Sequence, residues 1–379
     1  MRGDIGILLV PLVEQCAIPY EDVSFCVAVM QLVFGASQPA FGILANRKSN
    51  RFVLLLGVAF FIGSLVGMAL ATGPITLFVS LGVLFGLGAG AISFGLVLTS
   101  SINFVGQQRA MTISGMLNAA AGLGSFVFSP VLNGLVQAGG MGLVAAGMLV
   151  PFLALIPIVL VVTSKDKIAS LPSSDEPQIV KPGDLFKRAL HNRTFVLLII
   201  GFTTCGFHMV IIETHLFSQY VSYGIPADAA SWVFSLYGIF TIVGALLSGW
   251  LSTRVHKGRL LGFYYGFRAI WVLVYIFLVP KTIATAVIFS AGLGMTGDAT
   301  VSPTSGLVNR EFKFFEVATL IGVLFFCHQI GAFFSAWLGG VLLDVTGGYD
   351  AVWLLDVVLC AIACLASLRI PSRPLVAKQ

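Results

Sequence analysis

Two ionisable side chains of this chain lie inside long apolar runs, where a charge is costly to bury and is therefore a candidate functional group. Arg268 is nine residues beyond Arg259, a separation of about 13 Å along a helix. A guanidinium can bind a carboxylate through two parallel hydrogen bonds. Arg268 could therefore bind an anionic substrate, or it could be a structural arginine that ties its helix to a neighbour.

Asp298 occupies a second apolar run, and its distance from Arg310 along a helix is roughly 18 Å. Such depth leaves two interpretations open. Asp298 could pair with Arg268 on the preceding helix, or it could face a cavity and take up protons.

The apolar run over 194–222 is unusually polar. His208, His215 and Gln219 are seven and four residues apart, so one helix face should carry all three. Glu213 is nearer the outer end and should point elsewhere. We interpret the three as a stripe that hydrogen-bonds a substrate or relays protons. The alternative is a helix cap and hydrogen bonds between helices.

Three further polar residues are candidates at mid-depth. His328 and Gln329 lie about three helical turns beyond Glu316 and could hydrogen-bond a carboxylate. Glycines and alanines around them, such as Gly331, indicate tight packing, so structural hydrogen bonds are the alternative. Asp4 would also lie near the midplane if its helix were complete.

The elements that position these residues follow from composition. Of 379 residues, 58% are hydrophobic and only 10% charged, with a mean hydropathy of +0.99; soluble domains carry roughly 25% charged residues. Apolar runs of about 20 residues recur from end to end, and each can cross a bilayer. They are too long for barrel strands, so we predict an all-α polytopic membrane protein.

Apolar runs and chain breakers predict twelve helices, the first of them partial. Their ranges are 1–13, 21–44, 52–71, 75–102, 110–137, 141–163, 194–222, 227–251, 259–279, 282–306, 315–343 and 350–369. The polar stretch 164–193 is predicted to be a linker between an N-terminal half, 1–163, and a C-terminal half, 194–379.

The basic residues predict the orientation. The loops on the linker's side, together with the tail from Arg369 onward, hold 18 of the 21 Lys and Arg residues, whereas the opposite loops hold only Lys281. By the positive-inside rule the linker and the C-terminus are cytoplasmic, which suits a multi-pass protein of the cell membrane. Because the net charge of +5 is scattered over short loops, it does not indicate nucleic-acid binding.

An internal repeat relates the two halves. One constant difference in residue number, that between Pro19 and Pro226, also aligns Gly42 with Gly249, Arg47 with Arg254, Thr112 with Thr319, Gly115 with Gly322 and Gly124 with Gly331. Two parallel six-helix halves are therefore expected. The same offset aligns Met1 with His208. We therefore expect the first helix to be incomplete and upstream residues to be missing.

Two loops resemble the G-x-x-x-D-R-x-G-R-R gating loop of the major facilitator superfamily. They begin at Gly42 and Gly249, and their basic residues are Arg47, Arg51, Arg254 and Arg259. Asn46 and Thr253 stand where the family has an acid. Glycines and Pro130 in the run 110–137 are similar to a motif of the family's exchangers.

Within that superfamily the C-terminal half resembles the monocarboxylate and oxalate:formate antiporter branch. The segments that carry the resemblance are 213–216, 265–269, 300–306, 328–331 and 343–350. The resemblance implies a secondary transporter without a cofactor, expected to be a monomer. It would move a small organic anion, such as a monocarboxylate, by proton symport or exchange.

Two other classes of membrane protein fit the sequence less well. A non-transporting membrane protein, sensor-like or an inactive remnant, is the main alternative, and the partial first helix favours it. A membrane-embedded enzyme is not indicated, because the sequence shows no P-loop, no metal-binding spacing and no nucleophile–base pairing. The six cysteines lie in or beside apolar runs without C-x-x-C spacing, as expected of small hydrophobic residues.

Overall fold

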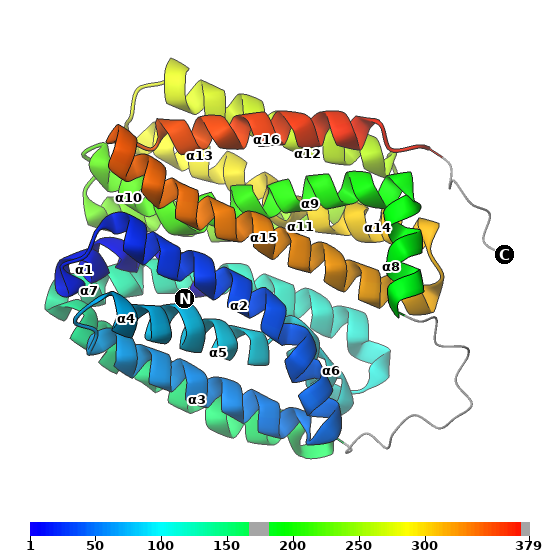
Figure 1. The fold of residues 1–379 in the computed structure, drawn as a ribbon, viewed down its shortest axis with the longest axis horizontal. Helices are drawn as coiled ribbons and strands as arrows, with labels where there is room; N and C mark the ends of the chain where they lie inside the picture. The colour runs from blue at the N-terminus through cyan, green and yellow to red at the C-terminus, as the bar shows by residue number, and fades with distance from the viewer. Residues whose placement is uncertain (167–181, 373–379) are drawn as a thin grey trace. The chain divides into compact units, whose positions relative to one another are not determined.

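The structure is a computed structural model that describes residues 1–166 and 182–372, and the regular elements in these ranges are helical (Figure 1). The chain divides into two compact units, Met1–Pro177 (unit 1) and Gln178–Gln379 (unit 2). Among the described residues, nine helices are long and apolar enough to cross a membrane, and Gly6–Cys16 is a shorter apolar helix. The predicted all-α polytopic fold is confirmed.

Unit 1 contains these elements in chain order: η1 (Arg2–Asp4), α1 (Gly6–Cys16), α2 (Tyr20–Arg47), α3 (Asn50–Ala69), α4 (Pro74–Leu77), η2 (Phe78–Phe85), α5 (Gly86–Ala91), α6 (Phe94–Val105), η3 (Gln107–Arg109), α7 (Ala110–Val162) and η4 (Thr163–Lys165). Helix α7 is two helices joined across a kink, because Gly139 and Gly140 have non-helical backbone angles. The predicted break between 137 and 141 lies at this kink.

Unit 2 contains α8 (Pro182–His191), α9 (Arg193–Ile211), η5 (Ile212–Leu216), α10 (Phe217–Ser222), α11 (Ala227–Leu251), α12 (Lys257–Leu273), η6 (Val274–Leu278), α13 (Ile283–Thr296), η7 (Asp298–Thr300), α14 (Val301–Glu311), α15 (Phe314–Thr346) and α16 (Asp350–Leu368). Three features differ from the sequence prediction. The helix expected over 75–102 is interrupted between Ala91 and Phe94, and the helix expected over 282–306 is interrupted at Gly297. The stretch 164–193 contains the ten-residue helix α8.

Helix α8 is short and amphipathic. Leu185 and Ala189 are buried, whereas Phe186 and Leu190 are exposed. Arg188 forms an ion pair with the buried carboxylate of Glu316, at the start of α15. This contact and its packing on α9 fix α8 at one end of unit 2.

The repeat predicted from sequence is present in the backbone of both units. Helix α2 begins at Tyr20 after Pro19, and α11 begins at the equivalent position, Ala227 after Pro226. The same offset relates the starts of α3 and α12 at Asn50 and Lys257, the starts of α6 and α14 at Phe94 and Val301, and left-handed turn residues at Ala17 and Gly224 and at Gly140 and Gly347. The constant offset between the two halves is therefore confirmed.

Glycines let helices of unit 2 approach at backbone distance. A Cβ atom at Gly206 of α9 would overlap the carbonyl group of His328 on α15. One at Gly331 of α15 would overlap the carbonyl of Thr203 on α9. Small residues allow this close approach in lipid, where dispersion contacts hold helices together.

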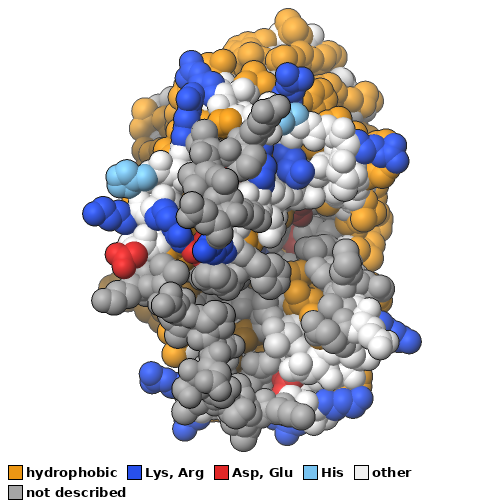
Figure 2. All heavy atoms as spheres, turned by 90° about the vertical axis from the view of Figure 1, so that its right-hand side faces the viewer, with side chains coloured by type: hydrophobic (Ala, Val, Ile, Leu, Met, Phe, Trp, Pro, Cys, Tyr) orange, Lys and Arg blue, Asp and Glu red, His pale blue; other side chains and the backbone are white. Residues whose placement is uncertain are grey.

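Basic and apolar side chains occupy different parts of the surface. Figure 2 looks at the molecule from the right-hand side of Figure 1. Lys and Arg side chains gather on the surface that faces the viewer, and hydrophobic side chains lie along its edges. Exposed apolar residues on the long helices include Leu246, Ile270 and Val358. Side chains of this kind face lipid in a membrane protein.

Candidate functional site

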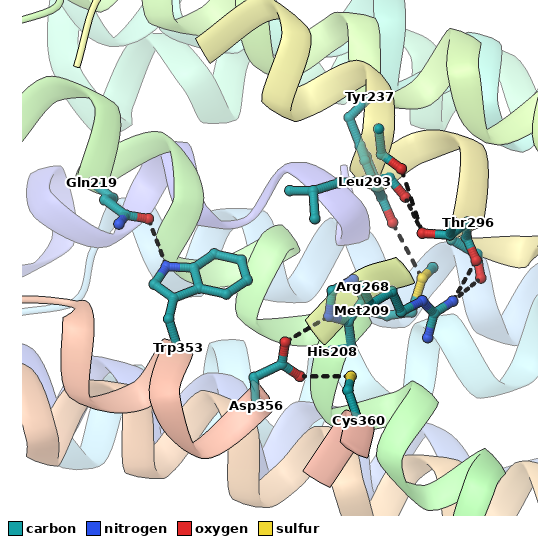
Figure 3. Close-up of polar contacts among 12 residues, drawn as sticks. His208, Met209, Gln219, Tyr237, Arg268, Leu293, Thr296, Trp353, Asp356 and Cys360 are labelled. Atoms are coloured by element: carbon teal, nitrogen blue, oxygen red, sulfur yellow. Dashed lines mark hydrogen bonds and ion pairs between the residues drawn. The ribbon is translucent and has the colours of Figure 1, made fainter. Parts of the chain in front are cut away.

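Arg268 of α12 is fully buried inside unit 2. Its Nη2 donates hydrogen bonds to the carbonyl oxygens of Thr296 and Gly297, the latter at 2.8 Å (Figure 3). The guanidinium carbon also lies 5.3 Å from the centre of the Tyr265 ring. Arg268 therefore places a positive charge at the C-terminal end of α13, where free carbonyl groups and the helix dipole favour a cation.

The chain interruption after α13 places Asp298 at the start of η7, where its side chain is exposed. Close packing surrounds the interruption: a Cβ atom at Gly294 would lie 2.6 Å from the carbonyl oxygen of Tyr237 on α11. The hydroxyl of Tyr237 is 3.2 Å from the Sδ atom of Met209 on α9. The structure thus holds the backbone of the interruption firmly and leaves the Asp298 side chain at the surface.

His208 of α9 contacts a carboxylate that we did not predict from the sequence. Its Nδ1 lies 2.7 Å from Oδ2 of Asp356 on α16, and both side chains are fully buried. The thiol of Cys360 donates to the other oxygen of Asp356 at 3.8 Å. His208 also interacts electrostatically with Arg268 (Figure 3). These side chains form a buried polar cluster that joins α9, α12 and α16.

The ligand atoms of His208, Asp356 and Cys360 lie within 4.8 Å of one another and could in principle hold a metal ion. A structural zinc site takes four ligands, however, and this group offers three. The guanidinium of Arg268 is close enough to interact with both His208 and Cys360, and its charge opposes a bound cation. The contacts suit a hydrogen-bonded histidine–carboxylate pair better than a metal centre.

His215 and Gln219, the other members of the predicted stripe, contact two different helices. Nε2 of His215 is 3.2 Å from the carbonyl oxygen of Ala336 on α15. Gln219 accepts from the indole of Trp353 on α16 at 2.8 Å and donates to the Tyr223 hydroxyl at 2.7 Å. The π-helical turn η5, which contains His215, lies between His208 and Gln219 and changes the angular relation of the three residues. The described hydrogen bonds of His215 and Gln219 join their segment to α15 and α16.

Glu213 and Gln329 are buried, and His328 beside Gln329 is half-buried. Glu213 lies in the π-helical turn η5 and is 6% exposed. Gln329 is 4% exposed, whereas His328 is half-buried with its ring 5.3 Å from that of Phe202. The close backbone contact at Gly206 makes this part of α15 a packing surface.

In unit 1, Asp4 is buried near the start of the chain. Its carboxylate lies 2.9 Å from the Met1 amino group and accepts a hydrogen bond from Ser129 of α7 at 3.1 Å. Arg2 donates to Gln31 of α2 at 2.9 Å. The described contacts of Asp4 thus tie the first residues to α7.

The four basic residues of the gating loops lie at helix ends. Arg47, Arg254 and Arg259 are exposed. Arg254 stacks on Trp250 with 4.1 Å between the guanidinium carbon and the ring centre. Nε of Arg51 donates to the Thr163 hydroxyl at 3.1 Å. Arg51 therefore joins the start of α3 to the end of α7.

Three features of the site were missed from sequence: the interruption at Gly297, the pairing of His208 with Asp356, and the role of Tyr237 beside the interruption. A signal for Asp356 existed, since it is the one carboxylate within the apolar stretch 351–368. No spacing rule links it to His208, because the two are 148 residues apart.

Comparison with known proteins agrees with this architecture. The family model described as Major Facilitator Superfamily matches residues 4–221 and again 216–379. An uncharacterized MFS-type transporter of Bacillus subtilis is 23% identical over all of this chain and 92% of its own length. Monocarboxylate transporter 12 of Xenopus laevis is 23% identical over 84% of this chain and 74% of its own.

Solved structures give the same fold. The crystal structure of a D-xylose-proton symporter matches with a TM-score of 0.72 and 14% sequence identity, covering 99% of this chain and 96% of the symporter.

Proposed function

Because the chain belongs to the Major Facilitator Superfamily and is a multi-pass membrane transporter, we propose that its solute is a small organic anion, such as a monocarboxylate. The relatives named monocarboxylate transporter support this solute class, and they align with most of the chain. The solute would move by alternating access of the two repeats, with proton symport or exchange.

The observation that carries the proposal is a pair of interrupted helices at corresponding positions. In unit 1, α5 ends at Ala91 and α6 begins at Phe94. In unit 2, the chain is interrupted from Gly297 to Thr300, before α14 begins at Val301. Interruptions at matching places of two repeats are a pointer to the solute site of a transporter. We place the solute-facing part of unit 2 near Asp298 on this basis.

We propose different roles for the other predicted site residues. Burial and hydrogen bonds to neighbouring helices favour a helix-packing role for His208, His215 and Gln219. The exposed loop residues Arg47 and Arg254 are candidates for the gate.

Transport in proteoliposomes tests the function. Purified protein would be reconstituted and offered radiolabelled lactate, pyruvate, formate and oxalate, with either an inward proton gradient or the same solute inside. We expect saturable uptake of at least one anion in one of these two modes. D-xylose is the control solute, and protein-free vesicles give the background. Uptake of xylose but of no anion would contradict the proposed class, and no uptake in either mode would favour the non-transporting alternative.

The orientation is a separate proposal. We propose that the linker 164–193 and the tail are cytoplasmic in the cell membrane, because 18 of 21 basic residues fall on that side. A cysteine introduced at Ser173 should resist an impermeant thiol reagent in intact cells, whereas one at Ala284 should react. The reverse pattern would show the opposite orientation.

A further inference from the structure

The end of unit 1 where α1 turns into α2 contains a pocket that the proposed transport function does not use. We infer that this pocket, beside Asp22, binds a small organic ammonium ion such as choline, with its carbon substituents against two phenylalanine rings. The pocket lies within unit 1, and its charge is opposite to that expected of a site for an organic anion. The inference is therefore independent of the proposed solute.

The packing of α2 explains where the pocket forms. Helix α2 contacts the segment from α4 to α5, and Figure 1 shows them side by side. A Cβ atom at Gly86 would lie 2.8 Å from the carbonyl oxygen of Met30. One at Gly82 would lie 3.4 Å from the carbonyl oxygen of Cys26. Phe78 stands four residues before Gly82, where a phenyl ring prevents so close an approach of the two helices.

A pocket of about 250 Å³ lies at this position. Its walls are Phe25 and Cys26 of α2, Pro74 and Ile75 of α4, Phe78 and one charged residue, Asp22. Asp22 and both phenylalanines are half-buried, so a ligand can reach them from outside, whereas Cys26 is buried. Mostly apolar walls with one charged group are typical of a site for a small molecule.

The walls favour a cation that carries carbon substituents. Phe25 and Phe78 stack with 6.4 Å between their ring centres and 20° between their planes. The faces of aromatic rings attract cations, and rings of this kind bind quaternary ammonium groups. Asp22 adds a full negative charge. A metal ion would gain nothing from apolar walls, and a single carboxylate is far from the six to eight oxygen ligands that Ca²⁺ takes.

The charges at this end of unit 1 also favour a cation. Glu14 lies near the end of α1, and Glu21 and Asp22 lie in the first turn of α2. The stretches 3–46 and 52–105 contain no Lys or Arg that could neutralise them. Acidic residues are common in the first turn of a helix because of the helix dipole. The pocket and its two rings, rather than the charge alone, therefore indicate the ligand.

Binding is tested with the purified full chain in nanodiscs of phosphatidylglycerol, a lipid without an ammonium group. Choline chloride should raise the thermal midpoint by about 2 °C at about ten times its dissociation constant. Sodium chloride at the same ionic strength is the control for salt. Dimethylbutanol, in which carbon replaces the nitrogen of choline, is the control for shape. Neither control should raise the midpoint.

Two variants assign the binding to the pocket. Asp22→Asn should weaken choline binding about tenfold, because the charged partner is lost. Glu21→Gln removes the neighbouring charge, which does not line the pocket, and should weaken binding less than about twofold. Phe78→Leu keeps an apolar side chain but removes the ring, and should weaken binding about two- to fivefold. Calorimetric titration of each variant, after its midpoint without choline shows that it is folded, gives these values.

A second lipid identifies the source of the ammonium group. If choline binds in phosphatidylglycerol but not in phosphatidylcholine nanodiscs, a lipid headgroup occupies the pocket and competes with it. Equal binding in both lipids assigns a soluble ammonium ion. Either result supports the inference.

Three results would overturn the inference. The first is dimethylbutanol binding as tightly as choline, which would show that the pocket selects shape and not charge. The second is an equal loss of affinity in Asp22→Asn and Glu21→Gln, which would show that choline responds to the general charge of this end. The third is the absence of a choline-dependent shift of the midpoint in phosphatidylglycerol. None of these results bears on anion uptake by the same protein in proteoliposomes.

Discussion

At the position where unit 2 has Arg268, the repeat offset places Phe61 in unit 1. Phe61 packs against the glycine-rich α5, since a Cβ atom at Gly88 would lie 3.1 Å from its ring. It also stacks on Phe152 with 4.7 Å between ring centres. Both side chains extend from corresponding helices, α3 and α12, towards an interrupted helix. An interruption therefore does not require a cation, and in unit 1 an aromatic ring fills the corresponding place.

Two other polar residues of unit 2 also correspond to apolar residues of unit 1. Asp298 corresponds to Ala91, and Asp356 corresponds to Leu149. Among the described residues of unit 1, Asp4 is the buried acidic or basic side chain, whereas unit 2 buries His208, Glu213, His215, Arg268, Glu316 and Asp356. The repeat thus preserves helix ends and turns, while the ionisable chemistry is concentrated in one copy.

The largest effect should come from breaking the buried pair of His208 and Asp356. Asp356→Leu introduces into unit 2 the leucine that unit 1 has at the corresponding position. It leaves His208 without its carboxylate partner in an apolar interior. We expect a loss of stability of about 3–5 kcal/mol, measured as a lower thermal midpoint in detergent. Adding His208→Met should recover most of this loss, because an apolar pair of similar volume needs no partner. A double variant as unstable as the single one would show that the pair has no mutual role.

A second test uses the aligned glycines Gly124 and Gly331. A Cβ atom at Gly331 would overlap the carbonyl of Thr203, whereas one at Gly124 would meet nothing within 4 Å. Gly331→Ala should therefore cost about 1–3 kcal/mol, because α9 and α15 must separate. Gly124→Ala should change stability by no more than about 0.5 kcal/mol. Equal decreases of the thermal midpoint in the two variants would contradict this prediction. They would show that the contact of α9 with α15 at Gly331 is no more sensitive to an added methyl group than the open position at Gly124.

The smallest effect is expected at the aligned arginines of the gating loops. Arg254 stacks on Trp250, and the residue that corresponds to Trp250 in unit 1 is Ile43. Arg254→Ala should lower stability by about 0.5–1 kcal/mol, the range of an exposed cation–π contact. Arg47→Ala should have a smaller effect on the thermal midpoint. A larger loss of stability in Arg47→Ala than in Arg254→Ala would indicate that Arg47 makes a contact that Arg254 lacks.

Most of the fold could be predicted from sequence, because each span is a long apolar run and the repeat offset aligns their ends. The interruption at Gly297 could not, since the stretch 283–297 contains no charged residue and a glycine within a membrane span is common. Helix α8 was not predicted, because its ten residues lie within a polar stretch. Arg268 and Asp298 were recognisable from the sequence as chemically important, but their partners depend on packing between helices, which a linear pattern does not contain.

Ala17 has a left-handed backbone with φ of 52°, and its counterpart Gly224 has φ of 82°. A left-handed conformation suits glycine and costs alanine roughly 1 kcal/mol. The turn between α1 and α2 thus persists with a residue that does not favour it. If both halves descend from one ancestral copy, the path of the backbone has been inherited more faithfully than the side chain that best fits it. The turn fixes where the next helix begins, and the surrounding helices supply the free energy that the local residue lacks.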